Sequence, residues 1–148
     1  MKFFTAMCLL TFFSISAIAQ TKEETEAWII KQTEVNPYGL KHSIEGDELI
    51  SHLELAGDKI IKAIPIGQVT QISYTHTNEY LSYGMTCNKP CAYLLDEPDE
   101  KQPKFLFEIY KKLDASYVPR MNKALLHLVK LHGGQAKIVK LETPKEAF

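Results

Sequence analysis

The chain has 148 residues, of which 45% are hydrophobic and 24% are charged, and it contains 7 glycines and 7 prolines. These proportions are typical of a soluble globular protein and exclude a disordered, collagen-like or polytopic membrane protein. A formal net charge of −1 argues against a nucleic-acid partner, because phosphate backbones are bound by strongly basic surfaces. The length suffices for one domain of ordinary size.

The first 19 residues have the three-part pattern of a secretory signal peptide. Lys2 supplies a positive charge, an apolar run extends from Phe3 to Ile15, and Ala17-Ile18-Ala19 is the small-x-small pattern that signal peptidases recognise. The run is shorter than the about 20 residues that a membrane-spanning helix requires. We therefore expect cleavage between Ala19 and Gln20, export to the periplasm or the extracellular space, and no stable membrane anchor afterwards.

The mature chain, residues 20–148, reads as a single domain because no repeat and no Gly/Ser-rich or Pro-rich linker divides it. A short helix is predicted over residues 22–33. Thr21 and Glu24 form a capping-box pattern at its start. Asn36-Pro37 marks its end.

Residues 38–110 have the alternation and the turn spacing of antiparallel strands. The clearest case is residues 48–55, in which Leu49, Ser51 and Leu53 alternate with residues on the opposite face. We expect seven strands in one meander, with the polar stretch 96–103 as a loop. The strands are predicted at residues 38–44, 48–55, 59–64, 69–77, 79–87, 91–95 and 104–110.

An amphipathic helix is predicted over residues 117–132. Pro119 lies in its first turn, where the missing N–H costs nothing, and Gly133-Gly134 ends the helix. Residues 135–148 form a tail, part of which is expected to pack back on the domain. The apolar side chains recur at intervals of three and four residues, at Met121, Ala124, Leu125, Leu128 and Leu131.

This order of elements resembles the pleckstrin-homology-like barrel. The stretch Pro65–Ile72 looks like the strand entry of such barrels, and Arg120–Leu131 with the glycines after it is similar to the C-terminus of small exported proteins of unknown function. The resemblance implies an α+β fold with an N-terminal helix, a seven-stranded, partly open antiparallel barrel, and a C-terminal amphipathic helix that caps the open end. Such barrels bind lipids, peptides or proteins, so no single ligand follows. A cystatin-like or nuclear-transport-factor-like sheet is the alternative fold.

Cys87 and Cys91 are the two cysteines of the mature chain, and an even number in an exported protein predicts a disulfide. We expect them to face each other across a hairpin with a three-residue loop. Opposed residues have Cα atoms about 4.5–5.5 Å apart, which suits a disulfide. The same register would pair Met85 with Tyr93 and Tyr83 with Leu95.

The same two cysteines permit two other interpretations. A thioredoxin-like redox site has the spacing Cys-x-x-Cys at the start of a helix, but here the spacing is one residue longer and no helix follows. A soft-metal site could combine the thiolates of Cys87 and Cys91 with Met85 and His76, a ligand set that suits Cu(I). A zinc site would require four ligands.

No catalytic signature is present in the sequence. It contains no Gly-x-Ser-x-Gly, no His-Glu-x-x-His and no phosphate-binding glycine loop, and no partner for a catalytic base can be named. We therefore expect a non-enzymatic binding or accessory module without a cofactor. Its partner would be a protein or peptide, bound at an open strand edge or in the groove beside the closing helix. A thiol-based Cu(I)/Zn or redox protein is the alternative.

Overall fold

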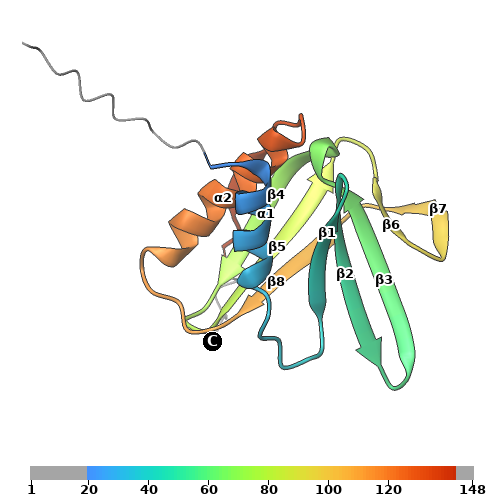
Figure 1. Cartoon of the computed structure of the whole chain (residues 1–148), viewed down its shortest axis with the longest axis horizontal. Coiled ribbons are helices and arrows are strands. Elements are labelled where there is room, and N and C mark those ends of the chain that lie inside the picture. Colours follow the sequence, from blue (N-terminus) through green and yellow to red (C-terminus); the bar gives the residue numbers. More distant parts are fainter. Residues whose placement is uncertain (1–19, 143–148) are drawn as a thin grey trace, which may run out of the picture.

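Two helices and two β-sheets make up residues 20–142, the part of the chain that the computed structural model describes (Figure 1). The predicted signal peptide, residues 1–19, lies outside the described residues, as do residues 143–148 of the tail. Within the described part, no helix is long and apolar enough to cross a membrane.

Helix α1 (Lys22–Lys31) begins at the predicted capping box. The Thr21 hydroxyl accepts a hydrogen bond from the Glu24 N–H at 3.1 Å, and the Glu24 carboxylate accepts one from the Thr21 N–H at 3.0 Å. Thr25 and Ile29, one turn apart, are buried. The predicted helix is therefore confirmed, although it ends two residues earlier than expected.

The first sheet has five strands, in the order β1-β2-β3-β6-β7, and all of its pairs are antiparallel. Strands β1 to β3 follow one another through tight turns. The β6–β7 hairpin extends away from the helices (Figure 1). The strands are β1 (Lys41–Glu45), β2 (Glu48–Leu55), β3 (Asp58–Pro65), β6 (Ala92–Leu94) and β7 (Glu97–Gln102).

The second sheet has four strands, in the order β8-β5-β4-β9. A 3₁₀ turn, η1 (Ile66–Gln68), leads from β3 into this sheet. The last strand runs parallel to its neighbour, whereas the other pairs are antiparallel. The strands are β8 (Phe105–Tyr110), β5 (Tyr80–Cys87), β4 (Val69–His76) and β9 (Lys137–Lys140).

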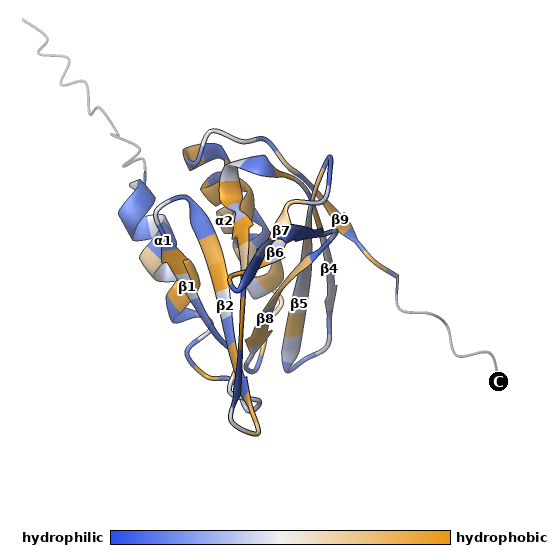
Figure 2. Cartoon of the chain, turned by 90° about the vertical axis from the view of Figure 1, so that its right-hand side faces the viewer, coloured by the Kyte–Doolittle hydropathy of each residue, from blue (hydrophilic) through white to orange (hydrophobic). Residues whose placement is uncertain are grey.

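The prediction of seven strands in one meander is wrong, because the described residues form nine strands in two sheets. Strand β7 occupies the stretch that was expected to be a polar loop. Five of its six residues are exposed, so it lacks the alternation that identifies a half-buried strand, and it is hydrophilic along its length in Figure 2. Strand β9 lies in the predicted tail and is only four residues long.

Helix α2 (Tyr117–Leu131) covers the second sheet and closes the core, as expected. Its apolar side packs in one cluster with Phe105, Phe107 and Ile109 of β8, all of which are fully buried. Gly133 has a φ of 80° just after the helix, the left-handed conformation that ends helices. The residues of α2 that face the core are Tyr117, Val118, Met121, Leu125, Leu128 and Val129.

The two sheets do not close into a barrel, because the free edge of β8 meets the first sheet through side chains. Ser51 of β2 donates a hydrogen bond from its hydroxyl to the Leu106 carbonyl at 3.4 Å. The Glu108 N–H donates to Nε2 of His42 on β1, also at 3.4 Å. In a closed barrel these backbone groups would bond to a neighbouring strand. Here His42 and Ser51 satisfy them instead.

Candidate binding groove between the helices

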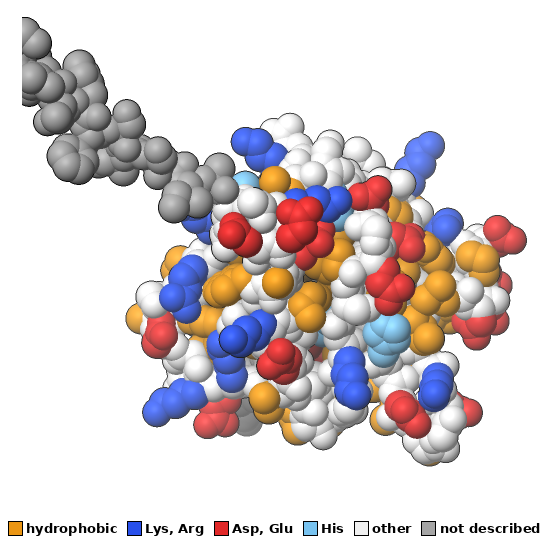
Figure 3. Space-filling view, in the orientation of Figure 1, with side chains coloured by type: hydrophobic (Ala, Val, Ile, Leu, Met, Phe, Trp, Pro, Cys, Tyr) orange, Lys and Arg blue, Asp and Glu red, His pale blue; other side chains and the backbone are white. Residues whose placement is uncertain are grey.

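A groove of about 470 Å³ lies between α1 and α2. Trp28 of α1 and Ala124 of α2 give it apolar walls. Arg120, Lys123 and His127 line it from α2 at intervals that place them on one face of the helix, opposite the residues that α2 buries in the core. Figure 3 shows basic and hydrophobic side chains next to each other over the two helices. A groove beside the closing helix is one of the two places where a partner is expected to bind from the sequence.

Arg120 is positioned over two aromatic rings. Its Cζ lies 5.8 Å from the ring centre of Trp28 and 5.9 Å from that of Tyr117, within reach of a cation–π attraction. A guanidinium that lies over aromatic rings leaves the N–H groups at its edge free to donate hydrogen bonds to a planar acceptor such as a carboxylate. None of the ion pairs among residues 20–142 includes Arg120 or Lys123.

Two ionisable groups near Arg120, Asp114 and Lys111, respond to its charge in opposite ways. Asp114 lies close enough for the charge of Arg120 to help lower its pKa, but the hydrogen bond from the Ser116 hydroxyl is the larger cause. The Asp114 carboxylate accepts from the N–H of Ser116 at 2.8 Å and from its hydroxyl at 2.6 Å. Burial, and secondly the charge of Arg120, lower the pKa of Lys111. Arg120 therefore has one charged neighbour of each sign, and neither forms an ion pair with it.

Tyr117 and Lys111 are held in place behind Arg120. Both donate hydrogen bonds to the side-chain carbonyl of Gln32, at 3.1 Å from the Tyr117 hydroxyl and 2.6 Å from the Lys111 ammonium. Burial raises the pKa of Tyr117 to about 12, so this hydroxyl stays neutral and remains a donor. The Tyr117 ring is thereby held at its hydroxyl by Gln32, and the Lys111 ammonium lies 4.1 Å from its centre.

The rim of the groove is completed by Gln20. Its carbonyl oxygen lies 3.4 Å from Nε2 of His127, so the imidazole donates there when Nε2 carries the proton. This leaves Arg120 and Lys123 as the cations that face the groove without a partner among the described residues.

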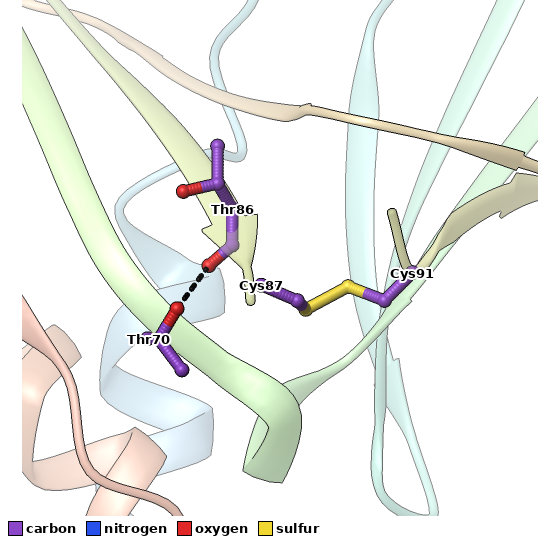
Figure 4. Close-up of a disulfide and its surroundings, with 4 residues drawn as sticks. All are labelled: Thr70, Thr86, Cys87 and Cys91. Atoms are coloured by element: carbon purple, nitrogen blue, oxygen red, sulfur yellow. Dashed lines mark hydrogen bonds between the residues drawn. A yellow bond between two sulfur atoms is a disulfide. The ribbon is translucent and has the colours of Figure 1, made fainter. Parts of the chain in front are cut away.

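Cys87 and Cys91 form the predicted disulfide, with Cα atoms 6.0 Å apart (Figure 4). The expected hairpin is wrong, because β5 pairs with β4 and β8, and β6 pairs with β3 and β7. Met85 therefore lies opposite Ile72 and Phe105 and does not pair with Tyr93. The disulfide joins Cys87, the last residue of β5 in the second sheet, to Cys91, which directly precedes β6 in the first sheet.

The structure does not bring the four candidate metal ligands together. Met85 is 3% exposed and lies in the core. Val69 is the β4 residue opposite Cys87, whereas His76 lies at the other end of that strand, about 23 Å away at the usual rise of a strand. Residues 20–142 contain no group of three or more His, Cys, Asp and Glu side chains that could hold a metal ion.

Two Ser–His pairs on β1 and β2 were not predicted. His42 lies 2.9 Å from the Ser51 hydroxyl, and His52 lies 3.0 Å from the Ser43 hydroxyl. Because Nε2 of His42 accepts from the Glu108 N–H, its proton is on Nδ1 and is donated to Ser51. Burial, followed by the charge of His52, lowers the pKa of His42 to about 4. The His42 pair is thus neutral and fully bonded, and its imidazole has no free nitrogen to act as a base.

His132, just after α2, was also missed. Its Nε2 lies 2.8 Å from the Glu26 carboxylate and its Nδ1 lies 3.1 Å from the Asp47 carboxylate, and its side chain is fully buried. The hydrogen bond from His132 is the largest cause of the lowered pKa of Asp47. This residue fixes α2 to α1 and to the β1–β2 turn.

The sequence signal for the groove was present but incomplete. The positions of Arg120, Lys123 and His127 repeat at three and four residues on the polar side of α2, and this repeat predicts one cationic face. It does not predict that Trp28 lies against that face, because the two helices are about ninety residues apart in the chain.

No known protein family matches the sequence, and comparison with curated proteins and with solved structures gives no match either. The resemblance to pleckstrin-homology-like barrels stays a prediction. We therefore infer the function from the geometry of the groove.

Proposed function

We propose that this protein is an exported, non-enzymatic binding module that holds an extended peptide, or a segment of another protein, in the groove between α1 and α2. The observation that carries the proposal is the lining of this groove, in which Trp28 lies beside two cations, Arg120 and Lys123, that have no ion-pair partner among the described residues. Trp and Arg are the residue types most enriched where proteins bind other proteins.

Export to the periplasm or the extracellular space is part of the proposal. The pattern of residues 1–19, with cleavage before Gln20, supports it. The disulfide between Cys87 and Cys91 is compatible with it, because such bonds persist in oxidising compartments. We also propose that the fold is a pleckstrin-homology-like barrel. In it, side-chain hydrogen bonds of Ser51 and His42 with β8 would take the place of backbone pairing between the two sheets.

The groove is a better site than an open strand edge. The edge of β8 is already bonded to His42 and Ser51. Strand β7 contains Pro98 and is acidic, and β9 begins with Lys137 and ends with Lys140, features that oppose strand addition at an edge. Strand β1, the fourth edge, is only five residues long.

A peptide selection with matched variants tests the proposal. Peptides are selected from a random library displayed on phage against residues 20–148, and their affinity is measured by calorimetry. Ala124→Trp fills the groove, whereas Ala27→Trp places the same side chain on an exposed position of α1 that does not line it. We expect Ala124→Trp to weaken binding at least about tenfold, which is 1.4 kcal/mol, and Ala27→Trp to leave it unchanged. Equal binding to both variants, or no enriched peptide, would contradict the proposal.

A further inference from the structure

We propose that the groove selects an extended segment of another protein that carries a carboxylate side chain and an apolar side chain next to each other on one face, and that Arg120 is the residue that recognises the carboxylate. This inference rests on the proposed function and adds to it the chemical class of the ligand and the residue that discriminates.

Charge complementarity is the first argument. Arg120 and Lys123 line the groove without an ion-pair partner among the described residues. The Asp114 carboxylate, whose pKa is lowered by hydrogen bonds from Ser116 and then by the charge of Arg120, forms no ion pair with Arg120. Lys111 adds a further positive charge behind Arg120. A ligand that brings carboxylates relieves this repulsion, whereas a basic ligand would increase it.

The positioning of Arg120 is the second argument. Its guanidinium lies over the rings of Trp28 and Tyr117, and Tyr117 is itself fixed by Gln32. A long side chain that is already held in place loses less conformational entropy on binding. Its planar edge matches both oxygens of a carboxylate. Lysine at this position would keep the charge and lose the two-point contact.

The spacing of the lining residues gives the ligand pattern. Arg120 and Ala124 lie four residues apart on α2, about 6 Å along the helix axis. In an extended peptide, side chains on one face recur about every 6.7 Å. The pattern acidic-x-apolar therefore places a carboxylate near Arg120 and an apolar side chain near Ala124 and Trp28, and a peptide with an acidic residue on both sides of the apolar one fits in either direction.

The single tryptophan of the chain, Trp28, lies in the groove and reports binding through its fluorescence. Two acetylated and amidated peptides serve as probes, one containing Glu-Gly-Leu-Gly-Glu and the other Gln-Gly-Leu-Gly-Gln. Residues 20–148 are titrated with each, as wild type and as the variants Arg120→Lys and Arg120→Gln. Lys130→Gln is the matched control, because Lys130 is an exposed cation of α2 that does not line the groove.

For the wild type and Lys130→Gln we expect the acidic peptide to bind at least about tenfold more tightly than the amide peptide, which a single charge-assisted hydrogen bond can supply. Arg120→Gln should abolish this preference, and Arg120→Lys should retain only part of it. Arg120 is exposed, so both variants are expected to fold, and circular dichroism checks this.

Three results would overturn the inference. Equal affinity for the two peptides would refute carboxylate recognition and leave the proposed function standing if library peptides still bind the groove. A preference that survives in Arg120→Gln would refute the role of Arg120. Self-association that Arg120→Gln abolishes would identify the occupant as a second copy, through its acidic stretch 96–100, and not another protein.

Discussion

His42 is a buried histidine whose bonds hold two sheets together. Its ring lies 4.6 Å from that of Phe107, centre to centre, and its two nitrogens bond to Ser51 and to the backbone of Glu108. This network needs the neutral imidazole, because Nε2 has to accept a hydrogen bond. Protonation of His42 would break the contact with β8 and leave a charge in an apolar site, which is costly.

The stability of the protein should therefore decrease in acid. The pKa of His42 is lowered from 6.5 to about 4 in the folded state, so the unfolded state binds more protons between these values and stability falls as the pH decreases through them. The full effect is about 3 kcal/mol, at 1.36 kcal/mol per pKa unit. Urea denaturation of wild type and His42→Gln at pH values from 7 to about 4 measures it.

The comparison with His42→Gln isolates the histidine, because the carboxylates titrate in both proteins. We expect the unfolding free energy of the wild type to fall more steeply than that of the variant below pH 6.5. Parallel curves for the two proteins would show that His42 is not held neutral.

Among the elements, those with strong local signals were predicted best. Helix α1 begins at the capping box of Thr21 and Glu24, and α2 is bounded by Pro119 and Gly133, all of which act within one or two turns. Strands β7 and β9 were missed because one is exposed and the other is short. Strand partners were predicted wrongly at Cys87, because alternation specifies the buried face of a strand and not its neighbour.

The disulfide connects the two sheets, but it closes a loop of only a few residues. The loop-entropy relation for five residues gives about 2 kcal/mol for such a bond. Since β5 and β6 are each held in their own sheet by other strands, we expect the double variant Cys87→Ser, Cys91→Ser to fold and to be less stable by about this amount. Urea denaturation with and without reductant provides the measurement.

The same experiment has an informative control. Reduction of the wild type should reproduce the loss seen in the double variant and should leave the variant unchanged. An unfolded double variant would mean that the disulfide, and not the strand pairing and the core, holds the sheets in place.

At the scale of the whole molecule, the α+β class and the two helices could be predicted from the sequence. The arrangement of two sheets could not, because it depends on bonds such as that between His42 and the Glu108 backbone, which join residues far apart in the chain. The composition of the groove was missed for the same reason, since Trp28 and Arg120 meet only when α1 packs on α2.

The central claim is that the ligand binds in the groove between α1 and α2. To test it, the peptide containing Glu-Gly-Leu-Gly-Glu is added to residues 20–148, and the amide chemical shifts that change are mapped in two-dimensional NMR spectra. We expect the largest changes at Trp28 and its indole N–H, at Arg120 and Lys123, and at the neighbouring positions of α1 and α2, with little change in the strands at the sheet edges. Changes centred on β1 or β7 would contradict binding between the helices.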